Sequence, residues 1–166
     1  FGVETYANSR RMEKSLRLQN ADLITQYNLI EADLARPKVK EADFRGKAKH
    51  LEYKARAHQP AMLCTLVMTE NTDSNGVKRY PVGNMPVLDP ETKEVLVDEL
   101  GRRSYTTSVA YGPTIGKNIA LAYLPWAYCQ EGRKLEVVYF NETYPVEVAA
   151  VGYQPLYDPE NLKPRS

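Results

Sequence analysis

The distribution of glycine and proline along the chain is the feature that most limits its fold. Of the 9 glycines and 11 prolines in 166 residues, 7 glycines and 9 prolines follow residue 60. Both residue types mark turns, because glycine accepts positive φ and proline lacks the backbone donor that helices and strands use. The sequence therefore predicts short strands separated by turns over residues 61–166, and a mainly helical segment over residues 1–60.

Alternation of side chains with a period of two predicts the strands. The first has apolar side chains on both of its faces, which is typical of a strand packed on both sides. A turn cluster over residues 71–77 follows it, and the later strands are joined by tight hairpins, one of them around residues 141–143. Strands are predicted over residues 62–69, 86–88, 93–97, 104–110, 119–124, 135–140 and 144–151. Short, evenly spaced strands of this kind indicate a small antiparallel barrel or a sandwich.

Helical periodicity is clearest over residues 44–57. Apolar side chains recur there on one helical face, and Asp43 stands where a side chain caps a helix. These apolar residues are Phe44, Ala48, Leu51 and Ala55. A second helix is predicted over residues 5–14, and residues 27–34 are compatible with a helix or a strand. Together the two parts predict an α+β protein with a short helical N-terminal segment followed by a small antiparallel β-barrel.

The charge balance and the apolar runs exclude two classes of partner. Lys and Arg number 22 against 21 Asp and Glu, whereas a dedicated nucleic-acid binder needs a clustered excess of basic residues. No apolar run approaches the roughly 20 residues of a membrane span. We therefore expect neither a nucleic-acid partner nor a membrane. The start at Phe1, without methionine or a targeting leader, suggests either a processed product or a fragment of a longer chain, and we expect the fragment.

The residue types that usually carry chemistry are sparse. The two histidines, His50 and His58, have no cysteine or glutamate at metal-ligand spacing, so we expect no metal site and no catalytic residue. Cys64 belongs to an apolar strand and Cys129 to a loop, so both are interpreted as packing residues. One cysteine pair is a weak disulfide signal, and a reducing compartment is the simpler interpretation. The expected location is therefore the cytoplasm.

A basic cluster near the amino end leaves two interpretations open. On a helix, Arg10, Lys14 and Arg17 share one face. The first interpretation is a solvated surface with Glu13 as a local partner. The second is an edge that binds an anion, because guanidinium groups pair with carboxylates through two hydrogen bonds.

Several blocks of sequence resemble the dimethylglycine and sarcosine dehydrogenase family, in its half that is similar to the glycine cleavage T-protein aminomethyltransferase. Asn8–Ser15 (NSRRMEKS) resembles the segment N-S-L-R-M-E-K, and Ala42–Lys47 (ADFRGK) resembles A-D-F-I-G-K. Thr107–Tyr123 (TSVAYGPTIGKNIALAY) is similar to T-S-G-x-Y-G-x-x-x-G-K-x-I-A-L-G-Y. Tyr80–Val87 (YPVGNMPV) resembles the family's segment p-x-G-n-e-P-V, and Tyr157–Asn161 (YDPEN) resembles the end of the family's chain. The blocks occur in the family's order along nearly the whole chain.

The resemblance implies a division of labour within a longer enzyme. Residues 1–60 would end the folate-binding aminomethyltransferase domain, and residues 61–166 would form its C-terminal barrel domain. The whole protein would oxidise an N-methyl amine at FAD, held by a preceding domain, and pass the carbon to tetrahydrofolate. The expected partners are thus the FAD and folate domains of the same protein and a small methylated amine, with a homo-oligomer as a further expectation. The piece alone would be inactive, and the location would be the mitochondrial matrix in a eukaryote.

The resemblance also gives four candidate cofactor-binding residues, Arg11, Glu13, Tyr27 and Tyr157. Arg11 and Glu13 occupy the R-M-E positions, which lie close to the folate channel in the family. Glu4 stands where the family has a folate-binding arginine, and this departure favours an alternative function. In that alternative the chain is a non-catalytic barrel that docks domains or subunits.

Overall fold

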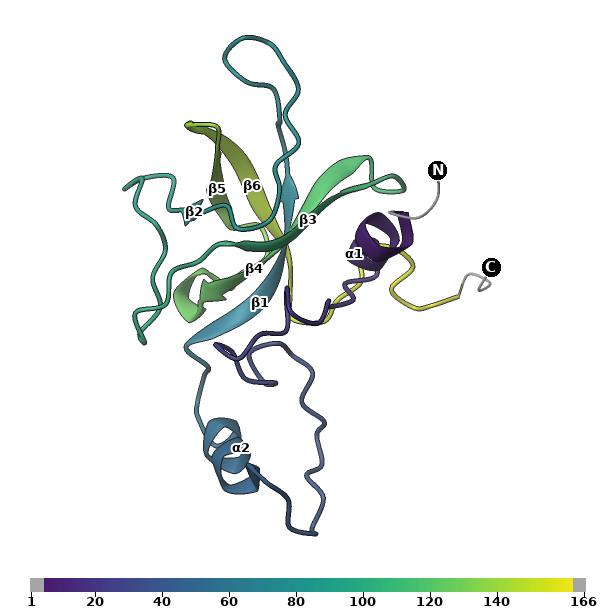
Figure 1. Cartoon of the computed structure of the whole chain (residues 1–166), viewed down its shortest axis with the longest axis vertical. Coiled ribbons are helices and arrows are strands. Elements are labelled where there is room, and N and C mark those ends of the chain that lie inside the picture. Colours follow the sequence, from purple (N-terminus) through teal and green to yellow (C-terminus); the bar gives the residue numbers. More distant parts are fainter. Residues whose placement is uncertain (1–4, 163–166) are drawn as a thin grey trace.

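The computed structural model of the chain describes residues 5–162 and shows a curled antiparallel sheet with short helices at its periphery (Figure 1). The strands are β1 (Ala61–Met68), β2 (Val87–Leu88), β3 (Thr106–Gly112), β4 (Lys117–Pro125), β5 (Lys134–Tyr139) and β6 (Glu142–Val151). The helical elements are the π-helix η1 (Thr5–Arg10), α1 (Arg11–Glu13), α2 (Lys47–Lys54) and the 3-10 helix η2 (Trp126–Tyr128). None of the helices within residues 5–162 is long and apolar enough to cross a membrane.

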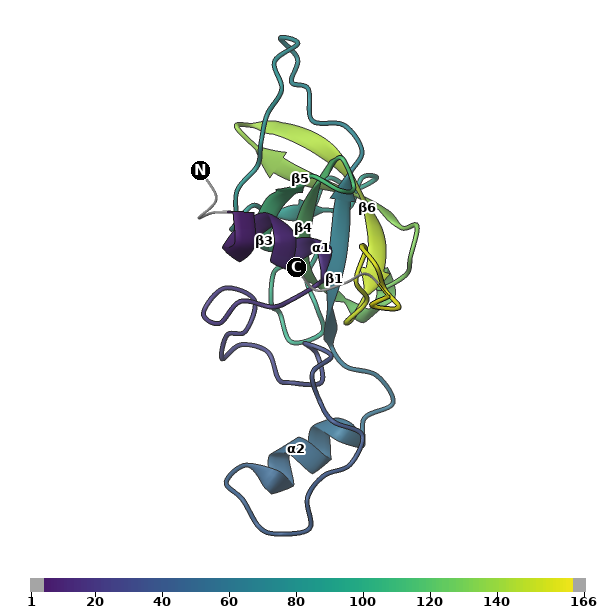
Figure 2. The ribbon, with the colours of Figure 1, turned by 90° about the vertical axis from the view of Figure 1, so that its right-hand side faces the viewer.

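The sheet curls back on itself to form the barrel. Its strands are hydrogen-bonded in the order β2-β5-β6-β1-β4-β3, and every adjacent pair is antiparallel. The backbone N–H of Val87 then donates to the carbonyl of Ser104 (3.1 Å), just before β3, and the N–H of Thr106 donates to Met85 (2.8 Å). A register shift between Thr65 and Leu66 accompanies the curvature, since bulges increase local twist. The predicted α+β fold with an antiparallel barrel is confirmed (Figure 2).

Two apolar cores lie on opposite faces of β1 and β4. One fills the barrel, and its largest side chains include Leu66, Leu124, Leu135 and Tyr144. The other lies outside the barrel, and its buried residues are Met12, Ala32, Ala61, Leu63, Ile119, Leu121 and Tyr123. The predicted double-sided packing of the first strand is therefore confirmed. Met12 and Ala32 of the amino-terminal segment pack directly on the outside of the barrel. The division of the chain into two domains at residue 60 stays a prediction.

The β5–β6 hairpin has the turn chemistry that its twist requires. Phe140 and Asn141 have φ of 50° and 59°, so both central residues are left-handed, as in a type I′ turn. Tyr139 pairs with Glu142 across this two-residue loop. The predicted turn over residues 141–143 is therefore displaced toward the amino end, with residue 142 already in β6.

The predicted helix over residues 44–57 is shorter and more exposed than its pattern suggests. Helix α2 begins after Gly46, whose φ is 86°, and ends at Lys54, so Asp43 does not cap it. None of its side chains is buried, and Leu51 remains 44% exposed. Figures 1 and 2 show the helix below the barrel, at the opposite end of the molecule. The apolar periodicity is real, but among the described residues no surface packs against it.

Two other predictions from the amino-terminal segment need correction. The predicted helix over residues 5–14 ends at Glu13, and Ser15 has a φ of 57°, so Arg17 does not continue the helical face of Arg10 and Lys14. Residues 27–34 form successive turns rather than a helix or a strand. Asn28 explains this, because its Oδ1 accepts the backbone N–H groups of residues 30 and 31 at 2.8 and 3.1 Å.

Leu66 and Leu51 lie in contrasting environments, so truncating each of them tests this architecture. Leu66 is fully buried in the barrel core, so Leu66→Ala should lower the free energy of unfolding by about 2–5 kcal/mol. Leu51→Ala, on the exposed helix, should change it by less than about 0.5 kcal/mol. Urea denaturation followed by circular dichroism measures both. A large loss from the Leu51 variant would show that α2 packs against another surface.

Candidate functional site

Arg11 attaches the amino-terminal segment to the barrel. It follows η1 at the start of α1, and its side chain is only 9% exposed. Its guanidinium donates to Asp22 Oδ2 (3.0 Å), to Ser108 Oγ on β3 (2.8 Å) and to the carbonyl of Leu16 (3.0 Å). Asp22 is fully buried and also accepts the backbone N–H of Leu18 (2.8 Å). Both charges are therefore paired and hydrogen-bonded away from water, the condition under which buried charges are tolerated.

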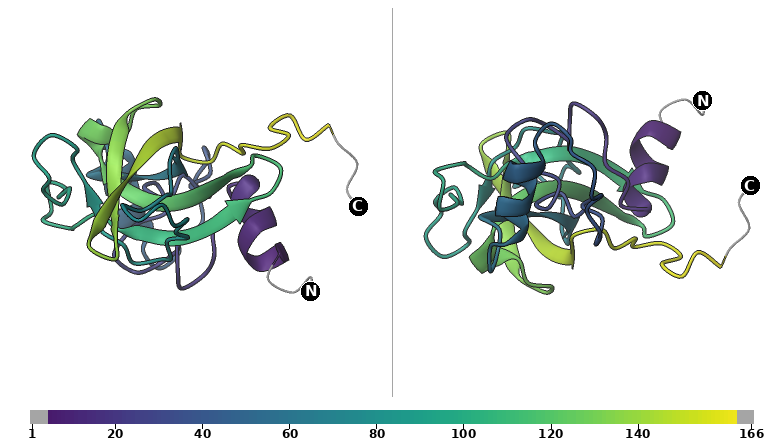
Figure 3. Two further views of the ribbon diagram at one scale, coloured as in Figure 1. Left: turned by 90° about the horizontal axis from the view of Figure 1, so that it is seen from above. Right: turned by 90° about the horizontal axis from the view of Figure 1, so that it is seen from below.

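Glu13 holds two further segments of the chain. Its carboxylate is buried and accepts the backbone N–H of Thr114 (2.6 Å), the Thr114 hydroxyl (3.0 Å) and the N–H of Ile115 (3.3 Å). These donors belong to the turn between β3 and β4. The backbone carbonyl of Glu13 accepts the N–H groups of Leu156 and Tyr157, each at 3.0 Å. One residue thus joins α1, the β3–β4 turn and the carboxyl-terminal tail. Figure 3 shows α1 and the tail on either side of this turn.

Three of the four predicted site residues line one pocket. Arg11, Glu13 and Tyr157 surround a cavity of about 390 Å³. The remaining lining residues are Arg10, Lys14, Leu16, Pro113 and Thr114. Lys14 Nζ lies 5.2 Å from the centre of the Tyr157 ring and 3.0 Å from Asp158 Oδ2. The pocket therefore combines basic side chains with an aromatic ring and an apolar wall, a lining suited to an anion with an apolar body. For the basic cluster, the structure decides neither for a solvated surface nor for an edge that binds an anion. Arg10 is exposed, whereas Lys14 is half-buried.

Tyr27, the fourth predicted residue, lines a different cavity. That cavity has a volume of about 630 Å³ and lies between the turns of the amino-terminal segment and α2. The Tyr27 ring stacks on Tyr123 with centroids 3.6 Å apart and planes within 3°, and the Arg102 guanidinium lies 4.4 Å from the Tyr27 ring. Burial raises the pKa of Tyr27 to about 12, so the phenol is neutral at physiological pH. The structure thus separates Tyr27 from the other three residues.

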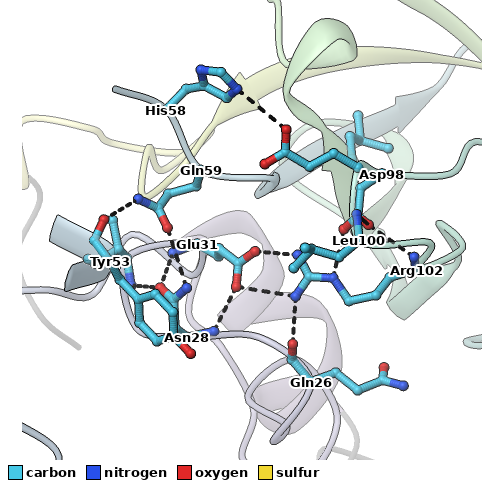
Figure 4. Close-up of polar contacts among 12 residues, drawn as sticks. Gln26, Asn28, Glu31, Tyr53, His58, Gln59, Asp98, Leu100 and Arg102 are labelled. Carbon is cyan, nitrogen blue, oxygen red and sulfur yellow. Dashed lines mark hydrogen bonds and ion pairs between the residues drawn. The ribbon is translucent and has the colours of Figure 1, made fainter. Parts of the chain in front are cut away.

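Arg102 is the centre of a second buried network, which sequence reasoning missed. Figure 4 shows its guanidinium directed at Glu31 on one side and at Asp98 on the other. Arg102 Nε lies 2.7 Å from Asp98 Oδ2, and Nη1 donates to the carbonyl of Gln26 (2.6 Å). Glu31 also accepts the backbone N–H of Asn28 (2.8 Å). Arg102 therefore fastens the turns of residues 26–31 to the loop before β3.

No sequence pattern marked the acidic partners of these two arginines. Asp22 and Glu31 stand among apolar neighbours in the sequence, and they meet Arg11 and Arg102 only through the tertiary fold. The described residues also contain no group of three His, Cys, Asp or Glu side chains that could hold a metal ion. Glu4, the departure from the family's arginine, lies outside the described residues. The cofactor-binding roles of Arg11, Glu13, Tyr27 and Tyr157 stay predictions.

Comparison with known proteins identifies the barrel. Residues 64–158 match the glycine cleavage T-protein C-terminal barrel domain. The chain belongs to this family. The crystal structure of the glycine cleavage system aminomethyltransferase T from Bartonella henselae has a TM-score of 0.68 and 20% identity, covering 88% of this chain and 37% of that chain. That likeness shows a shared fold.

The chain is also similar to longer proteins that are enzymes. The mitochondrial dimethylglycine dehydrogenases of Rattus norvegicus and Homo sapiens are each 28% identical to it, over 152 and 147 residues, covering 87% of the chain. The resemblance to this dehydrogenase family is therefore confirmed. The chain spans 15% of the length of these relatives. The family match includes Thr114 and Tyr157 but begins after Arg11 and Glu13, so the 390 Å³ pocket lies where the barrel domain meets the preceding segment.

Removing the Arg11 side chain should destabilise the whole fold. Arg11→Ala leaves Asp22 buried without its countercharge, so the free energy of unfolding should fall by about 3–5 kcal/mol. Arg45→Ala, at an exposed position, is the matched control and should change it by less than about 0.5 kcal/mol. Chemical denaturation measures both. Equal, small losses would contradict a supporting role for the Arg11–Asp22 pair.

Weakening the Glu13 acceptor should loosen one turn selectively. Glu13→Gln keeps the side-chain size but removes the charge that strengthens the bonds from Thr114 and Ile115, a loss of about 1–2 kcal/mol. Amide hydrogen exchange should accelerate at these two positions. The amide of Leu66, in the barrel core, is the internal reference and should keep its protection relative to them. Uniform acceleration over the barrel would contradict this assignment.

Proposed function

We propose that the chain is the C-terminal part of the tetrahydrofolate-dependent, aminomethyltransferase-like half of an FAD-dependent N-methyl amine dehydrogenase. In this proposal it closes one wall of the folate site, and the FAD and folate domains that precede it are its partners. The amine is of the dimethylglycine or sarcosine type. Expected locations are the cytoplasm or, in a eukaryote, the mitochondrial matrix. The observation that carries the proposal is the pocket that gathers Arg11, Glu13 and Tyr157 beside Lys14.

The pocket lining fits tetrahydrofolate as an amphiphilic anion. Folate carries aromatic rings and a carboxylate-bearing tail, and the pocket offers the Tyr157 ring, the apolar side chains of Leu16 and Pro113, and basic groups. The charged atoms of Arg11 and Glu13 already bond within the chain, so in this proposal these residues hold the wall in place. When bound, tetrahydrofolate would accept the one-carbon unit released by amine oxidation.

Lys14 is the residue of this chain best placed to meet a carboxylate of the ligand. Its ammonium is half-buried at the pocket, while the side chain of its partner Asp158 is only 6% exposed. A ligand carboxylate would therefore approach the ammonium from the pocket side and share it with Asp158. Tyr157 lies next to the same ammonium and would supply a flat contact. Neither residue moves a proton in this proposal.

The alternative is a non-catalytic barrel that docks domains or subunits. The internal hydrogen bonds of Arg11 and Glu13 favour it, because groups satisfied within the chain gain little from a new ligand. The two proposals differ in one measurable respect. Only the first requires the pocket between α1, the β3–β4 turn and the tail to bind tetrahydrofolate.

Calorimetric titration with tetrahydrofolate tests the proposal on a polypeptide that adds the upstream folate half to this sequence. Lys14→Gln should weaken binding about tenfold, the effect of losing one charge-assisted hydrogen bond. Lys93→Gln removes another ion-paired lysine, far from the pocket, and should leave the affinity unchanged. Binding that is insensitive to Lys14→Gln would place the site elsewhere. Absence of binding by the parent polypeptide would favour the docking alternative.

A further inference from the structure

The two cysteines of the chain, distant in sequence, meet at one end of the barrel. Cys64 lies on β1 opposite Ala122 of β4 and is fully buried in the barrel core. Cys129 follows η2 and is half-buried, at the start of the turn that leads to β5. Their sulfur atoms are 3.8 Å apart, and both are free thiols. The fold therefore brings together residues that sequence analysis interpreted as separate packing side chains.

The backbone on both sides holds this pair in register. The N–H of Trp126 donates to the carbonyl of Pro60 (3.1 Å), directly before β1, and the N–H of Cys129 donates to Trp126 (3.1 Å). The Cys129 thiol is within 3.3 Å of the carbonyls of Leu124 and Pro125. A disulfide needs a sulfur separation of about 2.05 Å. The remaining gap closes more easily by movement of Cys129, which lies in a loop, than of Cys64, whose strand pairs with β4 and β6 on its two sides.

Stepwise thiol–disulfide exchange requires one accessible thiol that attacks first and a second thiol that resolves the mixed disulfide. The two cysteines differ in this way. Cys64 donates its S–H to the sulfur of Cys129, and this hydrogen bond lowers the pKa of Cys129. The same hydrogen bond, with burial, raises the pKa of Cys64. Cys129 is also the more exposed of the two. The first attack on a soluble disulfide therefore belongs to Cys129, since the thiolate is the nucleophile.

We propose that Cys64 and Cys129 form an intramolecular disulfide when the chain meets a low-molecular-weight disulfide such as oxidised glutathione. Cys129 thiolate attacks one glutathione sulfur, forms a mixed disulfide and releases one glutathione thiolate. Cys64 sulfur then attacks Cys129 sulfur and releases the second glutathione, which takes up the Cys64 proton. Two protein thiols are oxidised, and one glutathione disulfide is reduced to two thiols.

The bond would fasten the turn after η2 to β1. Tyr128, beside Cys129, donates its hydroxyl to Asp89 Oδ2 (2.9 Å), and the Arg133 guanidinium lies 5.0 Å from the Tyr128 ring. The turn thus already links β4 to the loop after β2, and the disulfide adds a covalent link to β1. Its closed loop spans most of the barrel, and long closed loops restrict the unfolded chain strongly.

Incubation of the chain with oxidised glutathione, followed by denaturation and thiol alkylation, tests the proposal. Mass spectrometry should show loss of both thiols, a mass lower by about 2 Da and no retained glutathione. Dithiothreitol should restore both thiols. Peptide mapping should recover a cross-link between the segments of Cys64 and Cys129. Two intact thiols, a stable glutathione adduct on the parent chain, or a disulfide-linked dimer would each overturn the proposal.

Single-cysteine variants serve as controls for the order of events. Cys64→Ala should accumulate one glutathione on Cys129, because the resolving thiol is missing. Cys129→Ser should leave Cys64 unmodified in the folded chain, because it is fully buried. Oxidation of the parent chain should also raise its thermal midpoint. A midpoint that falls would show that the bond distorts the barrel and would overturn its fastening role.

Discussion

The buried ion pair between Arg11 and Asp22 is the interaction on which the arrangement outside the barrel depends. A buried pair contributes little net stability compared with apolar packing, but it is costly to break, so it selects one geometry. Here it fixes the distance between α1, the following turn and Ser108 on β3. Glu13, two residues further along, is then directed at the β3–β4 turn. The Arg102 network fixes the next stretch of the same segment in the same way.

The pocket beside α1 exists only because three segments distant in sequence converge there. The helix supplies Glu13, the β3–β4 turn supplies Thr114, and the tail supplies Tyr157. The tail is held by backbone bonds to Glu13, and Lys14 pairs with Asp158 of the same tail. The family match begins at residue 64, so the barrel alone contributes only part of this lining. The segment that precedes the barrel is therefore integral to the site.

Local pattern predicted six of the seven strands, whereas residues 93–97 form only isolated bridges at Val95 and Val97. It predicted the surroundings of the barrel poorly. The strand at residues 61–68 has the predicted double-sided packing because alternation is a property of the strand itself. The pattern of α2 is equally regular, but burial of a helical face requires a partner surface, which periodicity does not supply. Residues 27–34 form turns instead of the expected helix or strand, because the Asn28 side chain accepts backbone N–H groups of the residues that follow it.

The candidate site was also predicted only in part, because contacts between distant segments cannot be deduced from local pattern. The resemblance gave Arg11, Glu13 and Tyr157, which share a pocket, and Tyr27, which lies in another. It did not give Asp22 or Arg102, because a charge pair formed by the tertiary fold leaves no local trace in sequence. The contact between Cys64 and Cys129 depends likewise on how β1 meets the turn after η2.

The barrel interior is filled by side chains such as Leu66 and Tyr144, so it is a solid body rather than a container. Any small molecule must consequently be recognised at its periphery. Chemical selectivity can then change through pocket residues such as Lys14 and Tyr157, without substitutions in the barrel core or in the Arg11–Asp22 pair. Such a separation lets one scaffold serve successive metabolic roles.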